Sequence, residues 1–194
     1  MQPCPAPFNL ARYVLAAGRA TPDKVALAIL GPSRAERWRF ADLEAAVLGM
    51  AGGLRARGLA PGDRVLLRLD NTPDFPVAFL GCIAAGLVPV PTAAALTAPE
   101  LDRIDPLIAP AAIVAAPGIA LPSDPGCPVL TDLPALRAHA PAAYAMGDPD
   151  RLAYLVLTSG SSGRPRPVAH AHRAIWARRM MWDGWYGLQP SDRV

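Results

Sequence analysis

The chain has 194 residues, of which 52% are hydrophobic and 18% are charged, so it can bury a core and is not a disordered chain. Its three cysteines, Cys4, Cys82 and Cys127, lie far apart, which excludes a disulfide framework and favours a reducing, cytoplasmic location. The net charge is +3, and residues 151–194 carry 7 basic but only 2 acidic side chains. Such a local excess of positive charge attracts an anion: a nucleotide phosphate, a nucleic acid or a lipid headgroup.

One uncharged stretch, residues 75–99, is long enough to cross a bilayer. Its prolines and Gly86 divide it into a helix followed by a strand, and we therefore expect no membrane span. The first ten residues, MQPCPAPFNL, lack the basic region of a signal peptide.

The hydrophobic pattern predicts an α/β protein. The expected strands are 25–30, 38–40, 65–69, 87–90, 111–116, 129–130, 152–157 and 168–170. The expected helices are 10–19, one with its apolar face from 43 to 54, 73–85, one that opens at 97, and 172–185. Between 65 and 116, strands and helices alternate, which is typical of right-handed crossovers in a parallel sheet.

Four positions predict where helices begin or change direction. Asn9 and Thr72 are expected N-caps, and residues 97–100 have the spacing of a capping box. Pro106 is expected to shorten or kink its helix, because proline lacks the backbone N–H that the helix needs.

The segment 158–166, TSGSSGRPR, carries the candidate phosphate-binding site. It combines four hydroxyl side chains, two glycines and two arginines, and its candidate site residues are Thr158, Ser159, Gly160, Ser161, Ser162, Gly163 and Arg166. Glycines let the backbone turn tightly and expose its N–H groups. Hydroxyl and amide donors beside a guanidinium group suit a polyphosphate. The expected strand before the segment would hold it at a sheet edge, where ligands of open α/β folds bind.

Other loop types fit this segment less well. A Walker loop needs a lysine after its second glycine, and a nucleophile elbow needs a serine with glycine two residues away on both sides. A flexible Ser/Gly linker is the plain structural alternative. The preceding strand and the prolines Pro165 and Pro167 argue against the linker.

Beyond these local features, the segment is similar to the phosphate loop of the adenylate-forming superfamily: acyl-CoA synthetases, nonribosomal-peptide adenylation domains and luciferases. The positions that match are Thr158, Ser159, Gly160, Ser161, Gly163, Pro165, Val168 and His172. Ser162 replaces a threonine and keeps its hydroxyl. Arg166 replaces the usual lysine and keeps the charge, whereas Pro167 replaces a glycine and removes a backbone N–H.

Three earlier segments resemble the same superfamily, in the expected order. They are WRFADLEA at 38–45, GLAPGDRV at 58–65 and CIAAGLVPVPT at 82–92. The resemblance implies that residues 1–194 form the N-terminal portion of an AMP-binding large domain, a mostly parallel sheet with flanking helices that is incomplete. The character is closest to acyl- or benzoate-type CoA ligases.

The resemblance also implies a reaction in two steps. A carboxylic acid attacks ATP in the presence of Mg²⁺ to give an acyl-adenylate and pyrophosphate, and CoA then displaces AMP. The loop hydroxyls would cradle the β- and γ-phosphates, and Arg166 would offset the charge on the leaving pyrophosphate. The family's adenine motif and catalytic lysine lie after this loop. We therefore expect no catalytic residue within this chain and an enzyme that is catalytically incomplete; Lys24, the only lysine, has no feature of a catalytic one.

Two further clusters near the C-terminal end admit a functional and a structural reading. His170 and His172 could form a metal pair, but they have no third ligand nearby and fit ordinary polar positions better. Three arginines and three tryptophans could form a nucleic-acid face: Arg173, Arg178, Arg179, Trp176, Trp182 and Trp185. We expect instead that the tryptophans pack inward with Met180 and Met181, while the arginines stay in solvent.

Two alternatives to a ligase remain at this point. The chain could be a non-catalytic nucleotide- or phosphate-binding module, in which the loop binds and nothing reacts. Less well supported is a nucleic-acid-binding protein that uses the basic segment 151–194.

Overall fold

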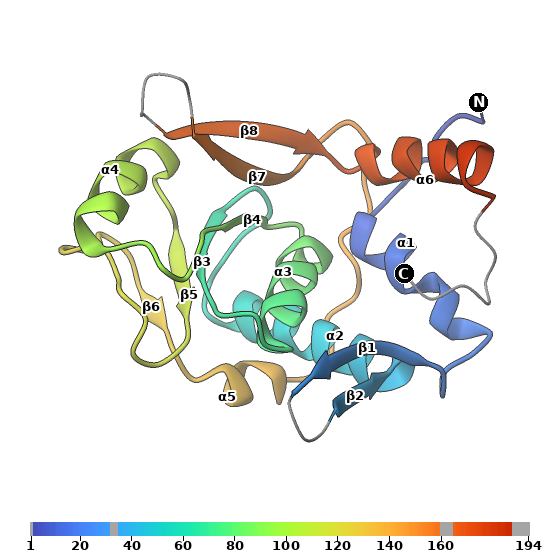
Figure 1. Ribbon diagram of the computed structural model, residues 1–194, viewed down its shortest axis with the longest axis horizontal. Coiled ribbons are helices and arrows are strands. Elements are labelled where there is room, and N and C mark those ends of the chain that lie inside the picture. The colour runs from blue at the N-terminus through green and yellow to red at the C-terminus, as the bar shows by residue number, and fades with distance from the viewer. Residues whose placement is uncertain (1, 32–34, 160–164, 188–194) are drawn as a thin grey trace.

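The computed structural model describes residues 2–31, 35–159 and 165–187. Its strands are β1 (Val25–Leu30), β2 (Ala35–Arg39), β3 (Arg64–Arg68), β4 (Val88–Pro91), β5 (Ala112–Ala115), β6 (Val129–Leu130), β7 (Leu152–Ser159) and β8 (Pro165–Ala171). Its helices are α1 (Leu10–Leu15), α2 (Phe40–Ala56), α3 (Asp74–Ala85), α4 (Ala98–Ile108), α5 (Leu133–Arg137) and α6 (Ala174–Trp185), and a short 3-10 turn, η1 (Ala16–Arg19), follows α1 (Figure 1).

A parallel sheet of four strands, in the order β4-β3-β5-β6, forms the centre of the molecule. Strands β3 and β5 are buried almost throughout, and their apolar runs, such as Val65–Leu67, fit a sheet that is covered on both faces. The helices α3 and α4 make the crossovers between the parallel strands, as the alternating pattern predicts.

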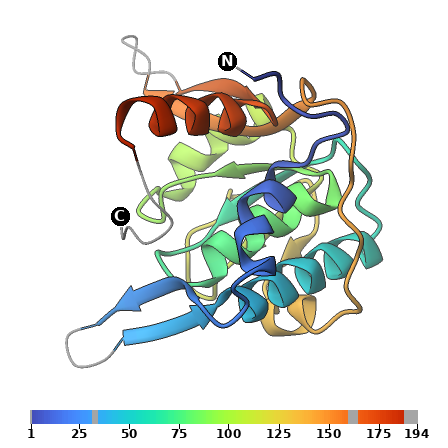
Figure 2. The same ribbon diagram turned by 90° about the vertical axis from the view of Figure 1, so that its right-hand side faces the viewer.

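Two apolar layers cover this sheet. On one face α2 packs against α3, which also contacts α1, and the three helices lie side by side in Figure 2. On the other face, Ile104 and Ile108 of α4 and Leu155 of β7 join the strand residues Leu66 and Val90 in a second cluster. The chain is thus an α/β fold with a mostly parallel sheet and flanking helices, as expected.

Two antiparallel hairpins stand beside the sheet. One pairs β1 with β2, and the other pairs β7 with β8 along the top of the view in Figure 1. Strand β7 contacts β4, and α4 contacts β8, so the second hairpin is supported by the central sheet and its crossover helix.

Most helix signals are found in place, and a few are wrong. The Asn9 side chain accepts hydrogen bonds from the amides of Ala11 and Arg12, and the Glu100 carboxylate accepts one from the Thr97 amide. The predicted helix over 10–19 is α-helical only to Leu15. Helix α3 has Pro73 at its N-cap rather than Thr72.

The helix with Pro106 continues two residues beyond it, to Ile108. Proline near the C-terminal end removes only one late hydrogen bond, so the expected shortening does not occur there. Helix α5, which the hydrophobic pattern did not predict, buries Leu133 and Leu136 against α2. None of the helices among the described residues combines the length and apolar character that crossing a membrane requires.

The strand β3 contains a buried arginine that the apolar pattern did not signal. The Arg68 side chain is 0% exposed and donates to the carbonyl oxygens of Ala120, Ala93, Ala94 and Leu96 at 2.6–3.1 Å. Burial lowers the pKa of Arg68, but a guanidinium stays charged at neutral pH. Arg68 therefore holds the loop after β4 through hydrogen bonds to its buried carbonyl groups.

Candidate functional site

The β7–β8 hairpin carries the predicted phosphate-binding segment at its closed end. Strand β7 ends at Ser159 and β8 begins at Pro165, with Ser159 opposite Pro165 and Thr158 opposite Arg166. Antiparallel partners place their side chains on the same face of a hairpin, so the structure brings Thr158 and Arg166 together. The other predicted residues, Gly160, Ser161, Ser162 and Gly163, lie outside the described residues.

Two of the predicted site residues, those whose side chains the structure describes, are open to solvent. Both Thr158 and Arg166 are exposed, and the Thr158 hydroxyl donates to the Arg166 carbonyl oxygen at 3.4 Å. A hydroxyl oxygen can accept hydrogen bonds, and a guanidinium has five N–H donors. A hydroxyl and a cation thus bracket the residues between the strands.

Because Pro167 replaces a glycine of the family's phosphate loop, it was expected in the loop, but the structure places it in a strand. It lies within β8, opposite Leu157, where residues on either side continue the pairing. Among the described residues β8 pairs with β7 alone, and proline is tolerated in such edge strands. The missing N–H therefore belongs to the strand rather than to the segment 160–164.

An apolar cavity lies along one face of the hairpin, where Tyr154, Val156 and His170 line it. The cavity has a volume of about 400 Å³ and lies between the hairpin and the helices α1, α3 and α6. Tyr154 stacks on His170 with ring centroids 4.6 Å apart, and Phe79 meets Tyr154 edge-on at 5.4 Å. Tyr154 is four residues before Thr158, so strand alternation puts both on the same face of β7. That alternation in the sequence is the signal by which Tyr154 could have been found.

The two histidines near the end of β8 have separate partners. His170 stacks on Tyr154, whereas the buried His172 accepts a hydrogen bond at Nδ1 from the Leu10 amide, at 3.0 Å. Burial and the nearby Arg151 charge lower the pKa of His172 to about 4. Within the described ranges no three histidine, cysteine or carboxylate side chains gather as metal ligands would.

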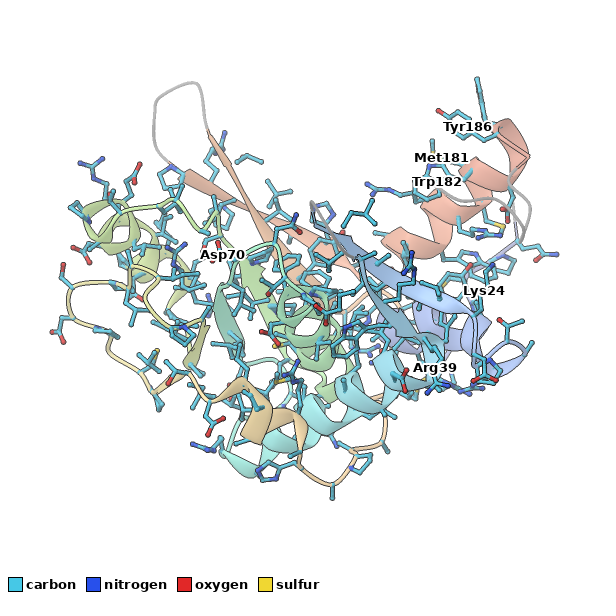
Figure 3. All side chains as sticks on the ribbon, turned by 60° about the horizontal axis from the view of Figure 1, so that its bottom comes forward. Lys24, Arg39, Asp70, Met181, Trp182 and Tyr186 are labelled. Carbon is cyan, nitrogen blue, oxygen red and sulfur yellow. The ribbon has the colours of Figure 1, made fainter. Side chains whose placement is uncertain are left out.

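The helix α6 departs from the expected inward packing. Trp176 is partly buried, and its indole N–H donates to the Gln2 carbonyl oxygen at 3.0 Å. Trp182, Trp185 and Met181 are instead exposed, with Trp185 85% accessible. Figure 3 shows Met181, Trp182 and Tyr186 standing out from the helix. The expectation fails because the described part of the chain provides no apolar surface against this side of α6.

Two of the basic side chains around α6 form ion pairs with acidic neighbours. Arg173 pairs with Asp150 at 2.6 Å, and Arg179 pairs with Asp183 at 2.7 Å. All four side chains are largely exposed, so the pairs add little stability, but they reduce the positive field that a nucleic acid would meet.

Comparison with known proteins gives one consistent answer. The model of a family described as AMP-binding enzyme matches residues 15–194. The chain is 34% identical over 178 residues to the phenyloxazoline synthase MbtB of Mycobacterium sp. (strain MCS), covering 89% of this chain and 14% of that protein. It is 31% identical over 194 residues to the long-chain-fatty-acid–CoA ligase FadD13 of Mycobacterium tuberculosis (strain CDC 1551 / Oshkosh), covering 91% and 38%.

A solved structure agrees on the fold. A benzoate CoA ligase from Burkholderia xenovorans LB400 superposes with a TM-score of 0.75 at 24% identity, covering 93% of this chain and 38% of that one. The chain therefore spans well under half the length of each of these proteins.

Proposed function

The chain belongs to the AMP-binding enzyme family, and from that premise we propose that it binds ATP within a ligase that activates a carboxylic acid as its acyl-adenylate. Residues 1–194 are, on this proposal, the N-terminal portion of the adenylation domain of a cytoplasmic enzyme. The named activities of the relatives, a long-chain-fatty-acid–CoA ligase and a benzoate CoA ligase, support an acyl or aryl acid as substrate and CoA as thiol acceptor.

The chemistry explains why such a ligase needs a phosphate-binding loop. A carboxylate is a poor electrophile, so one of its oxygens attacks the α-phosphorus of ATP and the bond to the β-phosphate breaks, which releases pyrophosphate. A thiol then attacks the acyl carbon of the mixed anhydride and AMP leaves. Both the pentacoordinate transition state and the leaving pyrophosphate are strongly anionic, so donors fixed around the β- and γ-phosphates lower the barrier.

The residues of the hairpin supply these donors. Hydroxyl groups of Thr158, Ser159, Ser161 and Ser162 would cradle the phosphates, Gly160 and Gly163 would allow the backbone to approach them, and Arg166 would neutralise charge. The observation that carries this assignment is the facing pair of Thr158 and Arg166 at the exposed end of β7–β8. Arginine in place of lysine favours bidentate contact with two phosphate oxygens.

The magnesium ion of such a reaction would enter as the ATP complex. The hydroxyl of Thr158 is a hard oxygen ligand that suits Mg²⁺, but among the described residues no three metal-binding side chains gather. Phosphate oxygens and water would supply most of its other ligands. Mg²⁺ would serve to neutralise the phosphates, beside Arg166.

Binding of ATP·Mg²⁺ by titration calorimetry tests this function. We expect Arg166→Ala to weaken binding about tenfold or more, because a charge-assisted contact contributes about 1.5–3 kcal/mol. The double variant Ser159→Ala with Ser162→Ala should weaken it further. Arg37→Ala, an exposed strand arginine of the other hairpin, is the matched control and should bind as the wild type does.

The opposite pattern would contradict the proposal. If Arg166→Ala and the double serine variant bind ATP·Mg²⁺ as tightly as wild type, the phosphate site lies elsewhere. Strong, salt-dependent binding of DNA or RNA that is the same in Arg166→Ala and the double serine variant as in the wild type would favour the nucleic-acid alternative instead.

A further inference from the structure

The open end of the β7–β8 hairpin is fastened to the N-terminal segment of the chain. Arg151 directly precedes β7 and His172 directly follows β8, and the His172 amide donates to the Arg151 carbonyl oxygen at 3.2 Å. The side chains of both residues form hydrogen bonds with the backbone of residues 8–10. The Arg151 guanidinium donates to the Phe8 carbonyl oxygen at 2.8 Å, and the Nδ1 atom of His172 accepts from the Leu10 amide at 3.0 Å.

The contact from His172 completes the cap of α1. The first amides of a helix have no partner within the helix. The Asn9 side chain accepts hydrogen bonds from the amides of Ala11 and Arg12. The amide of Leu10, the first residue of α1, needs a different acceptor. That amide is buried and 162 residues away in sequence from the imidazole that accepts its hydrogen bond.

The geometry also fixes the form of the imidazole. A ring nitrogen that accepts a hydrogen bond carries no proton, so His172 must be neutral with its proton on Nε2. The residue is 1% exposed, and the positive charge of Arg151 beside it disfavours a second proton. Asn9 extends the same cluster, because its amide group donates to the carbonyl oxygens of Ile83 and Ala145.

We propose that His172 is a positioning residue: by accepting the Leu10 amide it fixes the β7–β8 hairpin on α1 and so sets the place of Thr158 and Arg166 at the hairpin's far end. The functional part of this inference rests on the proposed nucleotide site, whereas the positioning itself does not. It gives a role to the histidine of the sequence motif, which neither phosphate binding nor a metal site explains.

The length of the hairpin makes the position of its far end sensitive to the contact of His172 with α1. Thr158 lies six residues along β7 from Leu152, or about 20 Å at about 3.3 Å per residue. A small change of tilt at the open end is therefore enlarged at Thr158 and Arg166. Strand β4 and helix α4 also support the hairpin, and His172 is the support that joins it to α1.

Amide hydrogen exchange in three single variants tests the proposal. His172→Leu removes the acceptor, His172→Asn keeps an acceptor close to the position of Nδ1, and His170→Leu removes a neighbouring imidazole that stacks on Tyr154. We expect His172→Leu to speed exchange at Leu10 about tenfold and to speed it measurably at Thr158 and Arg166. His172→Asn and His170→Leu should leave Leu10 protected.

Several results would overturn the proposal. One is His172→Leu with wild-type exchange at Thr158 and Arg166; another is His172→Asn with exchange as fast as in His172→Leu. A wild-type ¹⁵N spectrum that shows the proton on Nδ1 would contradict the hydrogen bond directly. Should His172→Leu fail to fold, His172→Asn is compared with His172→Gln, whose acceptor lies one bond further out and misses the Leu10 amide.

The same samples separate this inference from the proposed function. ATP·Mg²⁺ binding by the wild type and the three variants is measured beside the exchange. If the wild type binds no nucleotide, the proposed function fails while the exchange pattern still decides the role of His172. If the wild type binds ATP·Mg²⁺, His172→Leu should bind it more weakly and His172→Asn should retain most of the wild-type affinity.

Discussion

Arg166 and His172 lie six residues apart, at opposite ends of β8. The role of Arg166 could be predicted from the sequence, whereas the contact of His172 could not. The hydroxyl, glycine and arginine pattern of 158–166 predicted an anion site from residue chemistry alone. The partner of His172 could not be predicted, because no local pattern indicates that the ring meets the amide of Leu10 at the far end of the chain. Burial of that ring next to Arg151 has a measurable consequence.

The unfolding free energy should depend on pH through His172. Its pKa falls to about 4 in the folded chain, against about 6.5 when unfolded, so the unfolded state binds the proton first. Stability is therefore expected to fall as the pH drops from about 6.5 to 4, by about 1.4 kcal/mol per pH unit at most. Urea denaturation of wild type and His172→Asn across this range measures it. Equal pH slopes in the two proteins would show that His172 does not titrate in this way.

At the scale of helices and strands, the pattern predicted the elements that obey one periodicity. The parallel sheet over 65–116 was predicted correctly because its short apolar runs alternate with segments of helical period. Helix α5 was missed because five residues with a proline are too short for a helical period to show. The beginning of β8 was missed because Pro165 and Pro167 are unusual in strands and are allowed there only by the edge position.

Glycines in α2 mark where α5 approaches, and they give a test of this packing. A Cβ atom on Gly49 would lie 2.0 Å from the Arg137 carbonyl oxygen, which is backbone and cannot swing away. Alanine is the better helix former by about 1 kcal/mol, but this clash should outweigh the gain. We expect Gly49→Ala to lower the unfolding free energy by about 2 kcal/mol or more.

Gly184 in α6 is the matched control for that change. A Cβ atom on Gly184 would meet no neighbouring atom of the described residues within 4 Å. Gly184→Ala should therefore gain stability from helix propensity alone, by about 0.5–1 kcal/mol. Denaturation midpoints of the two variants measure both effects. A Gly49→Ala protein as stable as Gly184→Ala would mean that α5 does not rest on α2 as described.

At the scale of the whole molecule, the fold brings segments together that are distant in sequence. Residues 8–12, 145–151 and 172 meet in one polar cluster, and the cavity beside the hairpin is lined from α1, α3, β7, β8 and α6. The sequence predicted the α/β class and the family, but not these long-range contacts, nor the exposed side of α6 with Trp182 and Trp185. Side-chain burial there depends on what packs against the helix, which periodicity does not record.

On the proposed function, this chain holds ATP by its phosphates. Competition against bound ATP·Mg²⁺ tests it most directly, with magnesium pyrophosphate and adenosine as the two competitors. We expect that pyrophosphate displaces the nucleotide, that adenosine does not, and that Arg166→Ala weakens the competition by pyrophosphate. Displacement by adenosine with no effect of pyrophosphate would show instead that the binding energy comes from the base and ribose rather than from the β7–β8 hairpin.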